Sequence, residues 1–372
     1  MINIGITGQT GFIGTHLFNF LNLKKDEVRL VPFEDQFFSD QNDLEEFLTK
    51  CDAIVHLAAL NRHNDPQTIY DTNIGLVKKL MTALDRTGAR PHILFSSSTQ
   101  EERDNIFGKS KREGRQLLSQ WAEKNVVPFT GMVIPNVFGP FGDPYYNSVV
   151  ATFSHQLTHD EQPRVEIDAQ LKLIYIGDLV KVIWYLIMNR VSDGEFKVSP
   201  TDEAKVTEIV TLLQSFKDQY LENSIVPDLS DPFKRNLFNT FVCYIDHSKF
   251  FPYKLRLNTD ERGSFVETIK LNSGGQISFS TTKPGITRGN HFHTQKTERF
   301  AVIKGKARIQ LRRIGTDKVI NFDLDGTEPA FVDMPVWHTH NITNIGSEDL
   351  YTIFWISEFF DPSDPDTFFE KV

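Results

Sequence analysis

The hydrophobic positions in the first two-thirds of the chain gather in short runs separated by segments with helical patterns. In order along the chain, the apolar runs are "INIGIT", "RLVPF", "AIVHLAA", "HILFSSS" and "FTGMVI". This alternation of strands and helices predicts an α/β fold built on a doubly wound parallel sheet. Because such sheets bind ligands beyond the carboxyl ends of their strands, we expect functional residues at those ends.

The last third of the chain has a different pattern. Around residues 220–255 the helical alternation gives way to an aromatic, proline-containing connector, and short strands separated by glycine turns follow it. These strands are "GQISFSTT", "ERFAVIKGKARIQLRR", "VINFDLDG", "AFVDMP" and "LYTIFWISEF". Many short strands at close spacing predict an all-β sandwich or barrel. The 372 residues are therefore expected to form two domains, 1–245 and 246–372.

Composition narrows the classes of partner. The formal net charge of −9 and the scattered basic residues give no footprint for nucleic acid or an anionic membrane surface. The two cysteines, Cys51 and Cys243, form no C-x-x-C motif, which suits a reducing cytosol. The longest apolar stretch, at 182–188, is too short to span a bilayer, and Met1 leads almost directly into a strand, leaving no room for a signal peptide. We expect a soluble cytoplasmic protein.

A glycine-rich turn follows the first strand. Gly8, Gly11 and Gly14 have G-x-x-G-x-x-G spacing, with Phe12 and Ile13 at the expected start of a helix. Glycines here allow a tight turn, the approach of a pyrophosphate to the backbone, and close packing of helix on strand. A plain turn produces the same spacing, but the position between strand and helix favours a dinucleotide site.

Further candidates for cofactor binding lie at the ends of later strands. Glu34 and Asp35 follow the second strand, where a carboxylate accepts from a ribose 2′-hydroxyl and repels a 2′-phosphate; this favours NAD over NADP, although a surface loop is the alternative. Small residues end the strand expected to be the fourth and would let a cofactor lie close, and an asparagine follows on the next helix. These candidates are Leu57, Ala58, Ala59 and Asn73.

The glycine turn, "FSSS", "PNVFGP" and "YIGDLV" together resemble the extended short-chain dehydrogenase/reductase family, which acts mainly on nucleotide sugars and has a Rossmann-type fold. The resemblance covers residues 1–245. In that family a tyrosine exchanges a proton with the substrate oxygen, a lysine four residues later lowers the tyrosine pKa and holds the cofactor ribose, and a serine or threonine orients the substrate oxygen. Ser98 and Lys111 match the hydroxyl and the lysine, whereas Phe107 stands in the place of the tyrosine.

Phenylalanine keeps the ring but removes the acid. Phe107 is an engineered substitution, a natural loss that leaves a nucleotide-binding pseudo-reductase, or a site where another group or water supplies the proton. The nearest alternative phenols are Tyr145 and Tyr146, which are equally well explained as packing or sugar-contact residues. Candidate substrate-binding residues in this region are Asn136, Tyr146, Asn147 and Ser148.

The strongest chemical pattern is "PGITRGNHFHTQKTERFAVIKG". His291 and His293 alternate on a predicted strand and so share one face, and Glu298 lies where the chain can return beside them. Two imidazoles and a carboxylate suit zinc or a similar divalent ion. The stretch resembles the first motif of the cupin family, and "PVWHTHNITN" resembles the second, which implies His340 as the fourth ligand and leaves His338 free for another role. Satisfied histidines on a barrel wall, or a purely structural metal, are the alternatives.

"NTDERGSFVETIK" precedes the barrel and resembles a stretch of the dTDP-4-keto-6-deoxyglucose 3,5-epimerases that helps to hold a nucleotide sugar. The resemblance implies a substrate contact by Asp260 and Arg262, and a bidentate arginine suits a diphosphate. An acidic turn leading into a strand is the alternative.

The order of the two domains, with "YNSVVATF", "KPGITRGNH" and "FDPSDPDTFF", resembles the CapF-like family of bifunctional capsular polysaccharide enzymes. The resemblance implies a UDP-linked 2-acetamido-2,6-dideoxy-4-hexulose as substrate, on the route to UDP-N-acetyl-L-fucosamine for capsule or O-antigen. The cupin would epimerise C3, the first domain would reduce C4 with NAD(P)H, and the enzyme would be a homodimer or higher oligomer.

The C3 proton of this sugar is acidic because it lies beside the C4 carbonyl. Its exchange needs a base, an acid and positive charge near the developing oxyanion. The candidate acids and bases are His338, Tyr351, Lys296 and Glu267, which the sequence does not rank. The alternative functions are a scaffold whose cupin alone isomerises or binds a nucleotide sugar, and a cupin dioxygenase fused to a dinucleotide sensor.

Overall fold

The computed structural model describes residues 1–261 and 263–372, so the predicted substrate residue Arg262 lies outside the described residues. The chain packs into two compact units. The first comprises residues 1–149 and 167–206, and the second comprises residues 150–166 and 207–372. These units are defined by packing, and the boundary at residue 245 stays a prediction about where two independently folding domains meet.

The first unit is built on a six-stranded parallel sheet, which confirms the predicted doubly wound α/β fold. The strands in spatial order are β2 (Val28–Val31), β1 (Ile2–Thr7), β3 (Ala53–His56), β4 (His92–Ser98), β5 (Phe129–Ile134) and β8 (Asp193–Lys197). The strand that ends at His56 is the third along the chain, not the fourth as predicted. The residues between β2 and β3 instead form the short helix η1 (Asp35–Phe38) and helix α2 (Gln41–Thr49).

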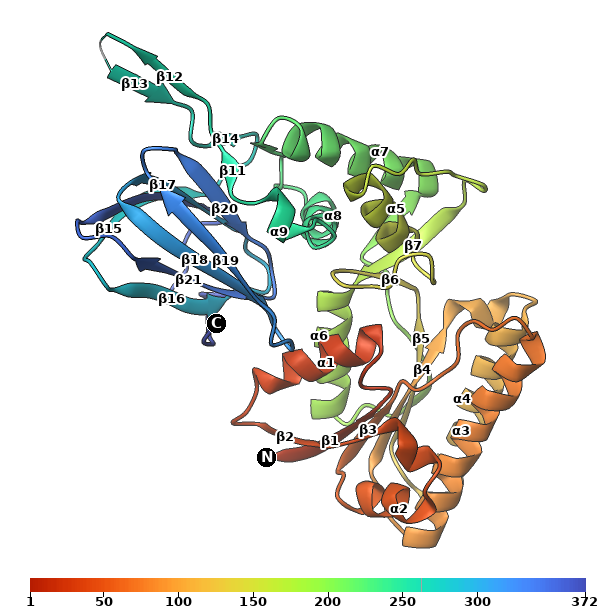
Figure 1. Ribbon diagram of the computed structural model, residues 1–372. Coiled ribbons are helices and arrows are strands. Elements are labelled where there is room, and N and C mark those ends of the chain that lie inside the picture. Colours follow the sequence, from red (N-terminus) through yellow and green to blue (C-terminus); the bar gives the residue numbers. More distant parts are fainter. Residues whose placement is uncertain (262) are drawn as a thin grey trace. The chain divides into compact units, whose positions relative to one another are not determined.

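Helices cover both faces of this sheet (Figure 1). One face carries α1 (Phe12–Asn22) and α6 (Ile176–Met188), and the other carries α2, α3 (Pro66–Thr87) and α4 (Ile106–Asn125). Because both faces are covered, every residue of β3 is buried, which explains its continuous apolar pattern. The ends of α3 follow local rules: Asp65 accepts hydrogen bonds from the first-turn N–H groups, and Gly88 closes the helix in the left-handed conformation.

A small sheet completes the first unit. Its strands are β6 (Asn136–Phe138), β7 (Gln170–Tyr175) and β9 (Asp202–Lys205), with β7 in the middle. β6 follows β5 directly, so the chain leaves the main sheet at Pro135 and presents Asn136 at the start of the next strand.

The second unit contains two five-stranded sheets whose paired strands are antiparallel, as predicted for a cupin-type barrel. The first sheet has the order β11 (Tyr253–Lys254), β20 (Ala330–Met334), β17 (Glu298–Lys304), β22 (Leu350–Ile356), β15 (Gln276–Thr282). The second has the order β19 (Val319–Asp325), β18 (Lys306–Arg313), β21 (His338–Asn344), β16 (Thr287–Phe292), β23 (Phe368–Phe369). Buried aliphatic side chains from both sheets, among them Val302, Ile309 and Ile342, form the core between them.

The segment predicted as a connector is largely helical. It contains the helices α8 (Pro232–Val242) and α9 (His247–Phe250). Before them come α7 (Val206–Phe216), the π-helical turn η3 (Lys217–Leu221) and the short strand β10 (Ile225–Val226). β10 pairs with β14 (Lys270–Leu271). The aromatic residues of the segment are the apolar face of these helices: Phe238 contacts both Phe216 and Tyr220. α5 (Val149–Thr158) also lies in this unit, apart from its first residue.

A buried ion pair joins the helical segment to the barrel. Arg299 on β17 makes a bidentate contact with Asp333 on β20, and Tyr220 donates to the same carboxylate. All three side chains are buried, so each charge has a partner where an unpaired one would be costly. The arrangement fixes β17 at the residue next to Glu298. Beyond α9, the strands β12 (Leu257–Asp260) and β13 (Gly263–Val266) form an exposed hairpin. Among the described residues, no helix combines the length and hydropathy needed to cross a membrane.

Candidate functional site

The glycine turn lies where the strand order of the parallel sheet reverses. β1 stands between β2 and β3, so the loops after β1 and β3 leave the sheet side by side at its carboxyl edge. Gly8 has a φ of +69°, and a Cβ atom on it would lie 2.7 Å from the backbone nitrogen of Ala58. The small residues after β3 therefore make room for the glycine turn itself, in addition to any space that they leave for a cofactor.

The same loop packs tightly onto helix α1. A Cβ atom on Gly14 would lie 2.2 Å from the carbonyl oxygen of Gly8, so only glycine fits there. Gly11 is the N-cap of α1 and has no side chain to cover the first-turn N–H groups of Phe12 and Ile13. An uncovered helix N-terminus of this kind suits the pyrophosphate of a dinucleotide, because its N–H groups and dipole both favour an anion.

The close approach at Gly14 makes a prediction. Gly14→Ala should raise the Kd for NADH at least tenfold, because the added methyl group must push the loop away from its binding conformation. Overpacking of this kind should also lower the free energy of unfolding by about 1–3 kcal/mol. Titration of NADH fluorescence and denaturant unfolding would measure the two effects.

Gly75→Ala is the matched control, since Gly75 lies inside α3 with open space around the added methyl group. That variant should bind NADH like the natural sequence and be more stable by roughly 0.5–1 kcal/mol. NADH binding by Gly14→Ala with unchanged affinity would refute the assignment of this loop.

Two other predicted cofactor residues have defined surroundings. Asn73 is buried on α3; its amide bonds both backbone groups of Leu60 and donates to Ser110 on α4. It therefore holds the loop that follows β3, which contains Ala59, against the two helices. Glu34 is exposed after β2 and accepts from Gln36 two residues later. Its preference for a ribose hydroxyl stays a prediction.

Lys111 lies in a buried aromatic environment at the carboxyl end of β4. Its ammonium is 3.4 Å from the Ser96 hydroxyl, 4.7 Å from the ring centre of Phe95 and 6.0 Å from that of Phe107. Burial lowers the pKa of Lys111 to about 8, although the nearby carboxylate of Glu101 acts in the opposite direction. The ring of Phe107 thus lies beside the lysine. Its correspondence to the family's tyrosine stays a prediction.

The hydroxyls at the end of β4 have different tasks. Ser98, predicted to orient the substrate, accepts from the backbone nitrogen of Gln100 and begins the short helix η2 (Thr99–Glu102). Ser97 donates to Glu101, whose carboxylate also pairs with buried Arg115. This ion pair anchors η2 against α4 and so fixes the turn on which Ser98 stands.

Sequence reasoning missed a histidine at this edge. His56 ends β3 and is 1 % exposed; its Nδ1 atom lies 2.6 Å from the Thr7 hydroxyl, and its Nε2 atom has no hydrogen-bond partner among the described residues. Burial, followed by the charge of Lys111, lowers the pKa of His56 to about 3, which keeps the imidazole neutral near pH 7. His56 belongs to the run "VHLAA", but the apolar pattern of this run did not distinguish it from its neighbours as a functional residue.

The predicted substrate segment lies after β6 and is exposed at Tyr145, Tyr146 and Asn147, with Ser148 partly buried. Arg62 donates to the backbone carbonyls of both tyrosines, which ties this segment to the loop after β3. Asn136 is exposed and donates to the carbonyl of Lys172. The structure therefore brings this segment and the loop after β3 to the same part of the first unit.

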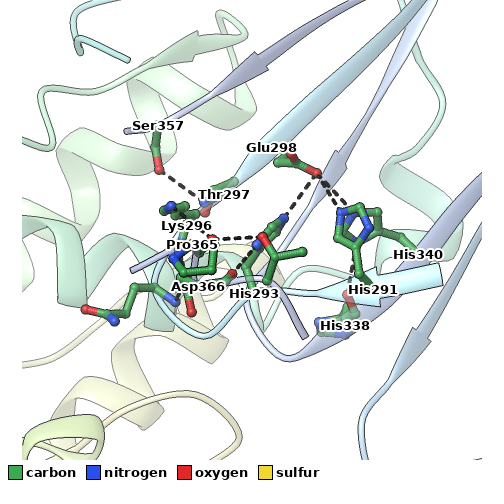
Figure 2. Close-up of polar contacts among 12 residues, drawn as sticks. His291, His293, Lys296, Thr297, Glu298, His338, His340, Ser357, Pro365 and Asp366 are labelled. Carbon is green, nitrogen blue, oxygen red and sulfur yellow. Dashed lines mark hydrogen bonds and ion pairs between the residues drawn. The ribbon is translucent and has the colours of Figure 1, made fainter. Parts of the chain in front are cut away.

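In the second unit, four side chains converge on one point (Figure 2). They are the predicted metal ligands: His291 on β16, His293 just beyond its end, Glu298 at the start of β17, and His340 on β21. Their ligand atoms all lie within 4.8 Å of one another. The Oε2 atom of Glu298 faces the three imidazole Nε2 atoms at 3.8 Å (His291), 3.4 Å (His293) and 3.0 Å (His340).

These separations fit a tetrahedral divalent ion. With ligands about 2.0–2.1 Å from zinc, two ligands of a tetrahedron are roughly 3.3 Å apart. The Nδ1 atoms of His293 and His340 face the carbonyls of Asp366 and His338, so these imidazoles carry the proton on Nδ1 and direct the Nε2 lone pair inward. Lone pairs and a carboxylate oxygen that converge in this way repel one another unless a cation lies between them.

The charge state of Glu298 agrees with this interpretation. Burial opposes ionisation of the carboxyl, but the three surrounding imidazoles hold the pKa of Glu298 well below its usual value. The Nε2 atom of His293 also lacks a hydrogen-bond partner in the described structure, which suits a metal ligand. The residues present therefore fit a divalent metal.

One side of this cluster is more open than the rest. The side chain of His291 is 24 % exposed, compared with 3 % for His293 and 1 % for His340. A substrate would therefore approach from the side of His291. The ring of Phe300 contacts that of His340 edge to face, with 5.9 Å between the ring centres.

The predicted acids and bases have different surroundings in the barrel. His338 is buried against His247, and burial, followed by the charge of His247, lowers the pKa of His338 to about 3. Lys296 is buried, and its ammonium donates to the carbonyl of Pro365. Thr352 on β22 pairs with Val302 on β17, so these two side chains lie on the same face of the sheet. Tyr351, the residue before Thr352, lies on the opposite face.

The remaining candidates lie on the hairpin β12–β13 or just after it. Glu267 is exposed and forms an ion pair with Lys270, and Asp260 is exposed at the end of β12. Neither belongs to the metal-ligand cluster.

Comparison with known proteins covers both units. Residues 4–198 match the model of the NAD dependent epimerase/dehydratase family, and residues 258–368 match that of the polysaccharide biosynthesis C-terminal domain. The chain is 34 % identical over 366 residues to UDP-2-acetamido-2,6-beta-L-arabino-hexul-4-ose reductase of Pseudomonas aeruginosa, covering 98 % of this chain and 97 % of that protein. Over 123 residues it is 24 % identical to the spore coat polysaccharide biosynthesis protein SpsL of Bacillus subtilis, covering 30 % of this chain and 82 % of that one.

A solved structure is similar over the full length. The capsular polysaccharide assembling protein CapF from Staphylococcus aureus is 36 % identical, covers 100 % of both chains and superposes with a TM-score of 0.63. The likeness thus extends through the parallel-sheet unit and the barrel together, in the same order along the chain.

Proposed function

Because the chain belongs to the NAD dependent epimerase/dehydratase family and is CapF-like over its whole length, we propose that it is a bifunctional nucleotide-sugar enzyme. In this proposal the cupin epimerises C3 of a UDP-2-acetamido-2,6-dideoxy-4-hexulose, and the first domain reduces the C4 ketone. The observation that carries the proposal is the presence, in one chain, of a glycine turn fit for a dinucleotide and a His₃Glu cluster fit for a metal. The product is a sugar for capsule or O-antigen synthesis.

The reductase half uses residues at the carboxyl edge of the parallel sheet. A nicotinamide bound at this edge supplies the hydride. Gly8, Gly11 and Gly14 hold its pyrophosphate, and Lys111 contacts its ribose from the buried position beside Phe95. Ser98 orients the C4 oxygen of the sugar. Glu34 favours NAD by accepting from the ribose 2′-hydroxyl.

The epimerase half uses the barrel. A bound divalent ion, for which zinc is the best match to this donor set, stabilises negative charge on the C4 oxygen. The side chains of the chain must remove the C3 proton from one face and return a proton to the other. His338 and Lys296 lie on the strand and loop that carry the metal ligands, whereas Glu267 follows the hairpin β12–β13. We propose Asp260 and Arg262 as contacts to the nucleotide diphosphate.

We also propose a homodimer or higher oligomer. β15 is at the edge of its sheet, and Ile277 and Phe279 on it are exposed. Proteins usually cover exposed apolar side chains on an open edge strand by pairing that strand with another chain.

Phe107 supports a second candidate function. If no other group supplies the proton at C4, the first domain binds the dinucleotide without reducing the sugar at a useful rate, and only the cupin acts on it. Tyr145 and Tyr146 are the alternative donors in the first unit, and their exposure leaves room for a substrate contact.

An exchange experiment tests the proposed function. The full-length protein, loaded with zinc and free of nicotinamide, should wash deuterium from D₂O into C3 of the UDP-4-hexulose, because enolisation moves a proton and no hydride. NMR would follow the exchange. Addition of NADH or NADPH should then cause nicotinamide oxidation at a rate set by the residue at position 107.

Chelation of the metal provides the control: it should stop the C3 exchange and leave the affinity for NADH unchanged. Exchange that occurs only in the presence of a nicotinamide would contradict the division of labour between the two domains. Absence of both exchange and nicotinamide oxidation would contradict the proposed function.

A further inference from the structure

The C-terminal residues run beside the strand that carries the metal ligands. β23 pairs with β16 so that Phe369 lies opposite His291 and Phe368 lies opposite Phe292. The backbone nitrogen of Glu370 also donates to the carbonyl of Asn290. The last residues of the chain therefore form the edge strand of this sheet, next to β16.

Asp366 begins this segment and is turned into the protein. It is 5 % exposed, and its carboxylate accepts from the backbone nitrogens of residues 294, 295 and 296 at 2.9–3.1 Å and from the Thr294 hydroxyl at 2.6 Å. These residues make up most of the loop between the ligands His293 and Glu298. A carboxylate with four donors is a firm anchor, because hydrogen bonds to a charged acceptor are stronger than neutral ones.

The backbone of Asp366 contacts the metal cluster more directly. Its carbonyl oxygen accepts from Nδ1 of His293, although the two residues are 73 positions apart (Figure 2). By contrast, the Nδ1 atom of His340 donates to a carbonyl on its own strand, that of His338. Asp366 has a φ of 37°, an uncommon value for a residue with a side chain, so surrounding contacts must hold it there.

We propose that Asp366 is a positioning residue for the metal site. Its carboxylate fixes the loop from Thr294 to Lys296, and its carbonyl fixes the tautomer and direction of His293. The two contacts depend on each other, since the carboxylate holds the backbone in the conformation that points the carbonyl at the imidazole. The inference rests on the proposed metal site, and it makes the C-terminal segment part of that site.

The test compares Asp366→Asn with a matched control in the same segment, Asp361→Asn. The amide at position 366 would direct an NH₂ group at backbone N–H donors, whereas Asp361 is exposed and accepts from the backbone nitrogen and hydroxyl of Ser363. Loss of an outer partner of a ligand typically weakens metal binding by about 10- to 100-fold, so Asp366→Asn should raise the Kd for Zn²⁺ by that factor. Asp361→Asn should stay within about twofold. Competition with a chromophoric chelator would measure both.

Cobalt spectroscopy separates positioning from general stability. The visible bands of the Co²⁺-loaded full-length protein should shift in Asp366→Asn, because the imidazole of His293 is no longer held in one direction, and should not shift in Asp361→Asn. A lower melting temperature with unchanged Kd and spectrum would overturn the inference while leaving the metal site intact. Failure of the natural sequence to bind Zn²⁺ would overturn both the metal site and the inference.

Thr294→Val is a milder variant in case Asp366→Asn does not fold. It removes a single hydroxyl donor from the Asp366 carboxylate and keeps the β-branched shape. It should weaken Zn²⁺ binding several-fold and shift the cobalt spectrum in the same direction. An unchanged affinity in this variant would count against the inference.

Discussion

Replacing Phe107 by tyrosine should raise the rate of C4 reduction by roughly a hundred- to ten-thousand-fold, the usual contribution of a positioned general acid. The physical reason is local. The ring of Phe107 lies beside the ammonium of Lys111, so a hydroxyl added to it falls in the field of a positive charge. That charge would lower the pKa of the new phenol and ready it for proton transfer. Single-turnover oxidation of NADH with the UDP-4-hexulose would measure the change.

Two further variants define the origin of the gain. Phe107→Leu removes the ring without adding a hydroxyl and should leave the slow rate unchanged. Lys111→Met on the tyrosine background should remove most of the gain, since the phenol would lose its neighbouring charge. The affinity for NADH should stay nearly constant between Phe107→Tyr and the natural sequence. If the natural sequence already reduces the sugar rapidly and the tyrosine variant is no faster, another donor such as Tyr145, Tyr146 or water carries the proton.

The parallel sheet was predictable because its strands are buried on both faces and therefore read as continuous apolar runs. The number of strands before His56 was not predictable, because the residues after β2 form a short helix whose aromatic side chains pack into the core. The aromatic residues of the predicted connector have the same explanation: they form the apolar faces of helices instead of a linker. In both places, apolar content identified burial but not the type of element.

The cluster of His291, His293, Glu298 and His340 was predictable because the spacing of these residues is local to two short motifs. The contacts that orient these side chains were only partly predictable. The carbonyl of His338 lies two residues from His340 on the same strand, but the partner of His293 is Asp366, in an acidic, proline-containing segment that resembles a solvated tail. A contact between residues 73 positions apart leaves no periodic signal. Ser96 and His56 were missed for a related reason, since their contacts form only when strands distant in sequence pair. Ser96 donates to the carbonyl of His56 on β3, and Nδ1 of His56 lies beside the Thr7 hydroxyl on β1.

Substituting His340 by alanine should raise the Kd for Zn²⁺ by about a hundredfold or more, because outer partners alone account for up to about a hundredfold. His338→Ala should change it far less. His340 is fully buried with its Nε2 atom 3.0 Å from Glu298, whereas the ring of His338 packs on His247. The backbone carbonyl of His338, which accepts from His340, survives in the alanine variant. Chelator competition would measure both affinities.

Thermodynamic linkage makes the two variants distinguishable even if both destabilise the barrel. Zinc at a hundred times its Kd adds about 2.7 kcal/mol to the stability of the folded state, whereas a hundredfold weaker site gains only about 0.4 kcal/mol at the same concentration. His338→Ala leaves a cavity and should lower the stability of the metal-free protein, yet keep nearly the full increment on adding zinc. His340→Ala should lose most of that increment. Equal loss of the increment in the two variants would contradict the assignment of His340 as the fourth ligand.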